Sequence, residues 1–215
     1  MILSAEKVCK NYGNQKILQN CSLSLRTGQC ALVRGPSGGG KSTLLRILAL
    51  LETADSGYVC HDDHRWDMSL PPRALAFPFL TVVFQQLFLW PNLTMAQNLS
   101  IVLKHDPQAP LTRQAIDLLE RFAITDLLKR RPHECSLGER QRLALARSLL
   151  SEAHFLLLDE PSSALDSANR NILVNELRFA VADNRGVLLV THDDHGFDEI
   201  LQESFLLENG RLERS

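Results

Sequence analysis

The most informative segment of this chain is Gly35-Pro36-Ser37-Gly38-Gly39-Gly40-Lys41-Ser42. It fits the pattern G-x-x-x-x-G-K-[ST] at every fixed position. A short apolar run, residues 30–33, precedes it, and a pattern with helical spacing follows from Ser42 through Leu51. A strand, a glycine-rich loop and a helix in this order predict a phosphate-binding loop. The alternative is a flexible turn with one exposed lysine, and such a turn does not need eight residues in this register.

The residue types of this loop suit the phosphates of a nucleotide. Glycines let backbone N–H groups crowd around phosphate oxygens, and the next helix directs the positive end of its dipole at the negative charge. Lys41 can reach the β- and γ-phosphates, and the Ser42 hydroxyl can ligate Mg²⁺. The predicted nucleotide-binding residues of the loop are Gly35, Pro36, Ser37, Gly38, Gly39, Gly40, Lys41, Ser42 and Thr43.

A second apolar run, residues 155–158, ends in two carboxylates, Asp159 and Glu160. At the end of a strand beside the phosphates, Asp159 would bind Mg²⁺ through its water shell, and Glu160 would be the general base for an attacking water. Such a run by itself is usually a strand that leaves the core. Together with the glycine-rich loop, it predicts a site for phosphate hydrolysis.

The remaining pattern predicts an α/β fold. The runs 30–33, 155–158 and 187–190 are continuously apolar, and a polar turn and a helical pattern follow each one, which is typical of a parallel sheet buried on both faces. Apolar and polar residues alternate over 2–8 and 17–25, which predicts half-buried antiparallel strands. Asn209-Gly210 lies between residues 205–207 and 211–212 and predicts a two-residue hairpin.

Residues 87–135 have a different character. They carry helical spacing, with Ile116, Leu118 and Leu119 following a cap at Thr112, and no convincing strand. We therefore expect a single domain over residues 1–215. Its fold class is an α/β P-loop NTPase core of mostly parallel sheet, with an N-terminal antiparallel β subdomain and an inserted helical subdomain over 87–135.

Composition excludes several other classes of protein. The 215 residues are 45% hydrophobic and carry a net charge of -2, so no basic field favours nucleic acid as a partner. The five cysteines form no C-x-x-C pair, which favours reduced thiols in the cytosol over disulfides or a zinc site. Because no apolar run approaches the length of a membrane span, a role at a membrane would need a partner protein.

Residues 135–142, Cys-Ser-Leu-Gly-Glu-Arg-Gln-Arg, resemble the L-S-G-G-Q signature of ABC ATPases, in its G-E-R-Q-R variant. They precede the Asp159-Glu160 strand, as in that family. Further residues resemble the family's landmarks in the family's order. They are the aromatic residue Tyr12, the glutamine Gln85 after Val82-Val83-Phe84, the D-loop Ser163-Ala164-Leu165-Asp166 and the switch histidine His192.

The resemblance implies a role for each of these residues. Tyr12 would stack on adenine, and His192 would contact the γ-phosphate. Gln85, which would connect the core to the helical subdomain, is expected to serve catalysis with Glu160 and His192. The metal ligands would be Ser42, Gln85 and Asp159, and further contacts to nucleotide would come from Ser136, Gly138 and Asp166. The implied cofactors are ATP and Mg²⁺.

The resemblance also implies partners. The helix that Ser136 caps would meet ATP held by a second ATPase subunit, in a homodimer. ATP hydrolysis would drive solute movement through a separate transmembrane permease, which would hold this chain in the cytoplasm at the inner face of the membrane. Residues 88–91, Phe-Leu-Trp-Pro, are expected to contact that permease. The alternatives are a regulatory ABC ATPase with weak turnover and a non-transport ABC protein, although the latter usually has fused cassettes or long coiled-coil insertions.

Two details concern the branch of the family. Residues 85–94 resemble polar amino-acid importers, whereas the G-E-R-Q-R variant resembles the lipoprotein-release and macrolide-efflux branch. These two resemblances conflict, so neither the cargo nor its direction follows from them. Leu137 stands where the first glycine of the signature is usual, and its side chain is predicted to hinder close approach to the partner's phosphate.

Overall fold

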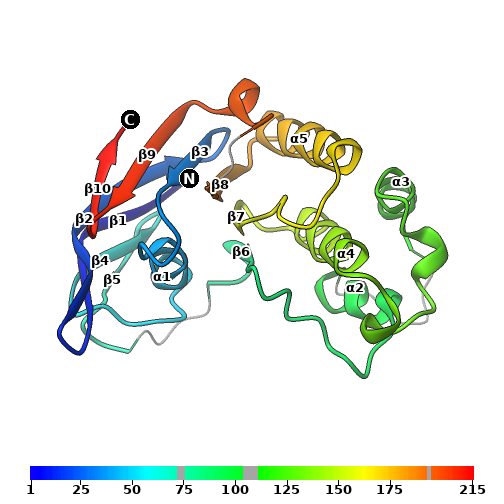
Figure 1. Cartoon of the computed structure of the whole chain (residues 1–215). Helices are drawn as coiled ribbons and strands as arrows, with labels where there is room; N and C mark the ends of the chain where they lie inside the picture. Colours follow the sequence, from blue (N-terminus) through cyan, green and yellow to red (C-terminus); the bar gives the residue numbers. More distant parts are fainter. Residues whose placement is uncertain (72–75, 104–110, 193–194) are drawn as a thin grey trace.

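The computed structural model describes residues 1–71, 76–103, 111–192 and 195–215. Two β-sheets share one hydrophobic core with helix α1 (Lys41–Leu48), which lies between them (Figure 1). The other helices of the described residues lie on the far face of the larger sheet (Figure 1). The phosphate-binding loop joins β3 (Cys30–Arg34) to α1, so it sits at the edge of the layer between the sheets.

The larger sheet has six strands in the order β10-β9-β3-β8-β7-β6. All neighbours are parallel except the hairpin of β9 and β10. The bounds of the other five strands are β6 (Leu80–Val83), β7 (Phe155–Asp159), β8 (Gly186–Val190), β9 (Glu203–Glu208) and β10 (Arg211–Arg214). The three expected buried strands are its centre. The sequence pattern missed β6, a four-residue strand at the edge that leads into Gln85.

The continuously apolar strands supply two cores at once. In β3, Ala31 and Val33 face the core that contains α1, while Cys30 and Leu32 face the core on the other side. Since successive side chains of a strand point to opposite faces, only an unbroken apolar run can serve both sides. This explains why these strands show no polar alternation.

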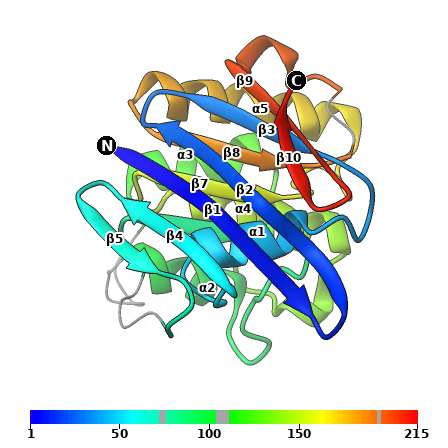
Figure 2. The ribbon, with the colours of Figure 1, turned by 90° about the vertical axis from the view of Figure 1, so that its left-hand side faces the viewer.

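The smaller sheet is antiparallel, in the order β2-β1-β4-β5, and faces the viewer in Figure 2. Its strands are β1 (Ile2–Tyr12), β2 (Gln15–Arg26), β4 (Ser56–His61) and β5 (His64–Asp67). The alternation of buried and exposed side chains in β1 shifts by one residue after Ala5, as the burial of Leu3, Ala5 and Val8 shows. Lys7, with φ 51°, lies within the register shift of β1 against β2 and within that of β1 against β4.

The far face of the six-stranded sheet carries the helices α2 (Met95–Leu103), α3 (Arg113–Arg121), α4 (Leu137–Leu149) and α5 (Ser167–Ala182). Three short 3₁₀ turns complete the described elements: Thr125–Leu127, Pro132–Glu134 and Asp198–Ile200. The described residues between 87 and 135 contain helices and turns but no strand. Helix α2 packs against α4, which lies beyond residue 135. The limits of 87 and 135 for the inserted subdomain therefore stay a prediction.

Helix α1 ends earlier than the pattern through Leu51 predicts. Leu50 adopts a left-handed conformation with φ 58°, and its N–H donates to Ile47 O at 3.0 Å. The Leu51 N–H donates to Arg46 O at 2.9 Å. These two bonds form a Schellman cap. The cap usually contains glycine, so the leucine at this position gave no sign that the helix stops.

The predicted hairpin at Asn209-Gly210 is confirmed, with φ 50° and 76° at its two central residues. The predicted antiparallel strands at the N-terminus are also confirmed, as β1 and β2. A mostly parallel sheet, an antiparallel β subdomain and added helices together confirm the predicted α/β class.

Candidate functional site

The phosphate-binding loop is held tightly against the neighbouring strand. A Cβ on Gly35 would lie 2.2 Å from the carbonyl oxygen of Leu207 in β9, so no larger residue fits there. Lys41 follows at the start of α1, and its Nζ donates to the carbonyls of Gly35 and Pro36 at 2.8 and 3.0 Å. The lysine thus lies along the loop, with its charge beside the loop's backbone and the N-terminus of α1.

The three predicted metal ligands lie together. Ser42, Gln85 and Asp159 line one cavity of about 300 Å³, beside Arg46. Burial raises the pKa of Asp159, although a hydrogen bond from Ser42 opposes the shift. A hydroxyl, an amide oxygen and a buried carboxylate are all oxygen donors of the kind that Mg²⁺ takes, so the residues present fit that ion.

The two carboxylates at the end of β7 diverge. Glu160 has φ 50°, and its N–H donates to Val190 O in the neighbouring strand β8. Its carboxylate accepts from the Thr191 hydroxyl at 2.9 Å and from the His192 N–H at 3.1 Å. The His192 ring nitrogen Nδ1 lies 2.8 Å from the same carboxylate. The structure therefore brings the predicted general base and switch histidine into direct contact.

The signature segment starts a capped helix. The Ser136 hydroxyl accepts from the Glu139 N–H at 3.3 Å, and the Glu139 carboxylate accepts from the Ser136 N–H at 2.7 Å. This reciprocal capping box begins α4 at the predicted place. A Cβ on Gly138 would lie 2.8 Å from Ala164 O, so this glycine permits close contact with the D-loop segment.

Two predicted residues have positions that need comment. Leu137, in the first turn of α4, is 55% exposed, so it does not pack inside its own chain. Asp166 accepts from the Asn169 N–H at 2.8 Å and caps helix α5. The cap accounts for the aspartate structurally, and its predicted contact with nucleotide stays a prediction.

Gln141 connects these segments, although the sequence gave it no role. Its side chain is buried and donates to the carbonyls of Glu160 and Pro161 at 3.1 and 2.7 Å. Its oxygen accepts from the Ala164 N–H at 2.9 Å. One glutamine of α4 therefore contacts both the segment that follows β7 and the predicted D-loop. Only its buried position in a polar stretch distinguishes it, and that is visible only in the fold.

Two further side chains hold the loop after Gln85. Asn98 is fully buried, accepts from the Trp90 N–H at 2.8 Å and donates to the Trp90 carbonyl at 3.1 Å. The Arg147 guanidinium of α4 donates to the carbonyls of Leu87 and Phe88 at 3.2 and 3.3 Å, and burial lowers its pKa. Phe88 and Trp90 are each 59% exposed on a backbone that is nevertheless fixed.

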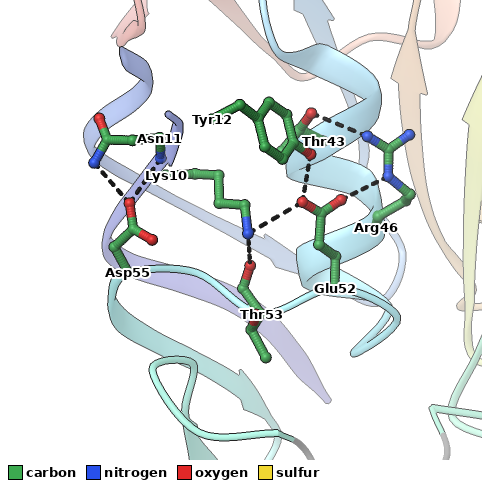
Figure 3. Close-up of polar contacts among 8 residues, drawn as sticks. All are labelled: Lys10, Asn11, Tyr12, Thr43, Arg46, Glu52, Thr53 and Asp55. Carbon is green, nitrogen blue, oxygen red and sulfur yellow. Dashed lines mark hydrogen bonds and ion pairs between the residues drawn. The ribbon is translucent and has the colours of Figure 1, made fainter. Parts of the chain in front are cut away.

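Tyr12 lies at the end of β1, where it pairs with Gln15 across the hairpin. Its ring is 46% exposed, and its hydroxyl donates to Glu52, which follows α1 (Figure 3). Arg46 and Lys10 also contact this carboxylate. The sequence predicted Tyr12 but none of these three partners, because they come together only through the packing of β1 on α1.

The polar segment His-Asp-Asp-His at residues 61–64 has a structural role. His61 and His64 flank a two-residue turn between β4 and β5, and His61 is buried with its Nε2 at 2.9 Å from Leu48 O. Among the described residues, no group of three or more His, Cys, Asp and Glu side chains is placed to hold a metal ion. None of the described helices is both long and apolar enough to span a membrane.

Several curated proteins are similar to this chain over almost its whole length. The sulfate/thiosulfate import ATP-binding protein CysA of Nitrosomonas europaea is 35% identical over 223 residues, which cover 100% of this chain and 60% of that protein. CysA of Anthoceros angustus is 37% identical, over 99% and 55% respectively. The probable CysA of Chlorella vulgaris is 37% identical, over 99% and 89%.

These relatives correct the prediction of the branch. All three are named for sulfate/thiosulfate import, not for polar amino-acid import, lipoprotein release or macrolide efflux. The G-E-R-Q-R variant does not identify a branch, because its Glu139 closes a capping box, which helices of many proteins use. The chain spans only 55% to 60% of the first two relatives, so it matches one part of those proteins.

Solved structures are similar as well. The dimeric structure of a bacterial ABC transporter cassette has a TM-score of 0.84 and 28% identity, and the match covers 99% of this chain and 97% of that one. A post-hydrolysis state of that cassette, bound to ADP and Pi, also has a TM-score of 0.84, with 27% identity. The predicted fold class is confirmed by these neighbours.

The comparison with protein families agrees with the geometry. The model described as "ABC transporter" matches residues 18–163, which is more than half of the chain and includes both the phosphate-binding loop and the signature segment. The chain belongs to the ABC transporter family, as an ATP-binding cassette.

Proposed function

We propose that this chain binds ATP with Mg²⁺, hydrolyses it to ADP and phosphate, and thereby drives solute import through a separate membrane permease. The observation that carries the proposal is the cavity lined by Ser42, Gln85 and Asp159. In the chain, Lys41 directly precedes Ser42 and Glu160 directly follows Asp159. A loop for the phosphates, oxygen ligands for a metal and a candidate base adjoin one another. The presence of Glu160 and His192 favours a cassette that hydrolyses ATP over a regulatory cassette with weak turnover.

Each side chain has a defined task in this mechanism. Lys41 exchanges its two backbone acceptors for the β- and γ-phosphates. Ser42, Gln85 and Asp159 would hold Mg²⁺, which would supply positive charge to neutralise the phosphates. Glu160 takes a proton from the attacking water, while Thr191 and the His192 N–H orient its carboxylate. The contact between Glu160 and His192 Nδ1 links the base to a side chain that is 64% exposed and free to reach phosphate.

The geometry favours a dimer as the working unit. Ser136 and Leu137 present the N-terminus of α4 at the surface, where the positive end of the helix dipole suits a phosphate. We propose that this end meets ATP bound to a second copy, and that Gly138 and Asp166 lie at the same junction. The solved cassette that is described as dimeric supports a second copy as the partner.

The proposed permease contact rests on Phe88 and Trp90. Both are 59% exposed, yet Arg147 and Asn98 hold the backbone that carries them. Rigid exposed aromatic side chains are typical of protein interfaces. We propose that the permease binds here, at the inner face of the membrane, and the names of the relatives support import as the direction.

Replacement of Glu160 tests the proposal. Glu160→Gln keeps the shape of the side chain but removes the base, so ATP turnover should fall by roughly 10²–10⁴-fold while ATP still binds in calorimetry. Glu120→Gln, an exposed position on α3, is the matched control and should hydrolyse ATP normally. Turnover near the wild-type rate in Glu160→Gln would contradict the assigned base.

A further inference from the structure

The tip of strand β1 is anchored to the segment that follows α1 (Figure 3). Lys10 Nζ donates to the carbonyl of Thr53 at 2.7 Å. Asn11 donates both its backbone N–H and its side-chain amide to Asp55 Oδ2, at 2.7 and 2.6 Å. These bonds lie outside the pairing of β1 with β2, so they fix the tip of β1 relative to α1.

Glu52 gathers three donors at the centre of this contact (Figure 3). The Tyr12 hydroxyl donates to Oε1, and Lys10 Nζ lies 3.2 Å from the same oxygen. Arg46 Nε donates to Oε2 at 2.8 Å, and its Nη2 donates to the Thr43 hydroxyl at 3.1 Å. A continuous chain of polar contacts therefore runs from Tyr12 to the first turn of α1, directly after the phosphate-binding loop.

The carboxylate of Glu52 is held as an ion. Its side chain is 18% exposed and lies between two cationic side chains, those of Lys10 and Arg46. Burial acts to raise the pKa of Glu52, but hydrogen bonds from Tyr12, Arg46 and Lys10 outweigh it and hold the pKa below its usual value. An ionised acceptor makes a strong hydrogen bond to the Tyr12 hydroxyl. One edge of the ring is thereby fixed while nearly half of the residue stays exposed.

Tyr12 borders a hairpin that lies beside the phosphate-binding loop. Tyr12 pairs with Gln15 at the hairpin that leads into β2. Two residues later, Ile17 packs against the loop itself, since a Cβ on Gly40 would meet its side chain at 2.9 Å. A base that extends from phosphates at the loop toward β1 can therefore contact this hairpin. A fixed aromatic face is a surface on which any base can stack.

We infer that Glu52 is a positioning residue for the nucleotide base, which it serves by fixing the ring of Tyr12 and tying it to Thr43 through Arg46. The inference rests on the proposed binding of ATP. Because Glu52 acts through Tyr12 and not on the phosphates, it should raise the affinity for a nucleotide that carries a base, and not the affinity for phosphate groups alone. Loss of the Tyr12–Glu52 bond should weaken ATP binding by about 3- to 10-fold, which corresponds to the typical net contribution of one hydrogen bond.

The test compares two ligands and three variants. Kd values for ATP and for inorganic triphosphate are measured by calorimetry in Tyr12→Phe, Glu52→Ala and the double variant, together with kcat and KM. We expect each single variant to raise the Kd and KM for ATP by about 3- to 10-fold and the double variant to add nothing further. The affinity for triphosphate, which has no base, should not change.

Two features keep the test decisive. Tyr12→Phe retains the ring and the ion pairs of Glu52, so it should fold even if Glu52→Ala does not. Glu6→Gln, which breaks a Glu–Arg pair with Arg65 elsewhere on β1, is the control and should leave both affinities unchanged.

The possible outcomes separate this inference from the proposed function. An unchanged ATP affinity in Tyr12→Phe, an equal loss of triphosphate affinity or additive effects in the double variant would each overturn the role of Glu52. The proposed function would stand in all three cases, because the wild-type chain would still bind ATP. A wild-type chain that binds no ATP would overturn both.

Discussion

Two opposing requirements act on the ionisation state of Asp159. It is 4% exposed at the end of β7, where burial disfavours its charge and raises its pKa. The proposed metal site nevertheless needs the charged form. Because the pKa in the folded state lies above that of the unfolded chain, ionisation lowers the stability of the fold as the pH rises from the unfolded pKa, and this loss is complete above the folded pKa. Binding of a cation would offset this loss.

Removal of the charge should therefore stabilise the nucleotide-free protein. We predict that Asp159→Asn raises Tm at pH 7 and that this gain disappears at a pH below the unfolded pKa of aspartate, where the wild-type carboxyl is neutral. Turnover of MgATP should be lost in the same variant. Thermal melts across pH check the first part, with the exposed Asp126→Asn as control. A lower Tm at pH 7 would show that the charge of Asp159 stabilises the nucleotide-free fold.

Helix α4 joins most parts of the site. Its first turn carries the capping box of Ser136, Gln141 reaches the catalytic strand end and the D-loop, and Arg147 holds the loop after Gln85. A displacement of α4 would therefore move both the proposed base, Glu160, and the proposed permease contact. The same helix exposes Leu137 at the surface where we propose that a second copy binds.

Leu137 provides a test at this helix. If its side chain hinders approach to the partner's phosphate, Leu137→Gly should tighten the ATP-bound dimer, because relief of a steric clash contributes about 1–3 kcal/mol. The extra backbone freedom of glycine costs about 0.5–1 kcal/mol, so the net gain should be small but measurable. Sedimentation of Leu137→Gly in a Glu160→Gln background checks this. A weaker dimer would mean that Leu137 packs usefully against the partner.

The elements that sequence predicts well are those set by local pattern. The glycine-rich loop, the unbroken apolar strands and the Asn209-Gly210 hairpin each follow from a few neighbouring residues. Contacts between distant segments gave no such signal. Glu52 meets Tyr12 and Arg147 meets Phe88 only because the fold brings them together. The sequence pattern also does not predict local backbone exceptions, such as the left-handed conformation of Leu50, because they depend on packing around the residue.

Under the proposed function, the whole molecule carries two half-sites at different places. The loop at residues 35–42 begins helix α1 between the sheets, whereas the signature end of α4 belongs to the helical side of the six-stranded sheet (Figure 1). One copy therefore offers a loop for one nucleotide and a helix end for another. A second copy related by twofold symmetry would complete both sites at once.

Sedimentation of the Glu160→Gln variant measures this directly. The variant should bind ATP without consuming it, so it should sediment as a dimer with MgATP and as a monomer with MgADP or without nucleotide. Lys41→Ala in the same background is the control, and its loss of the β/γ-phosphate contact should keep it monomeric. A Glu160→Gln chain that stays monomeric while saturated with MgATP would contradict a site shared between two copies.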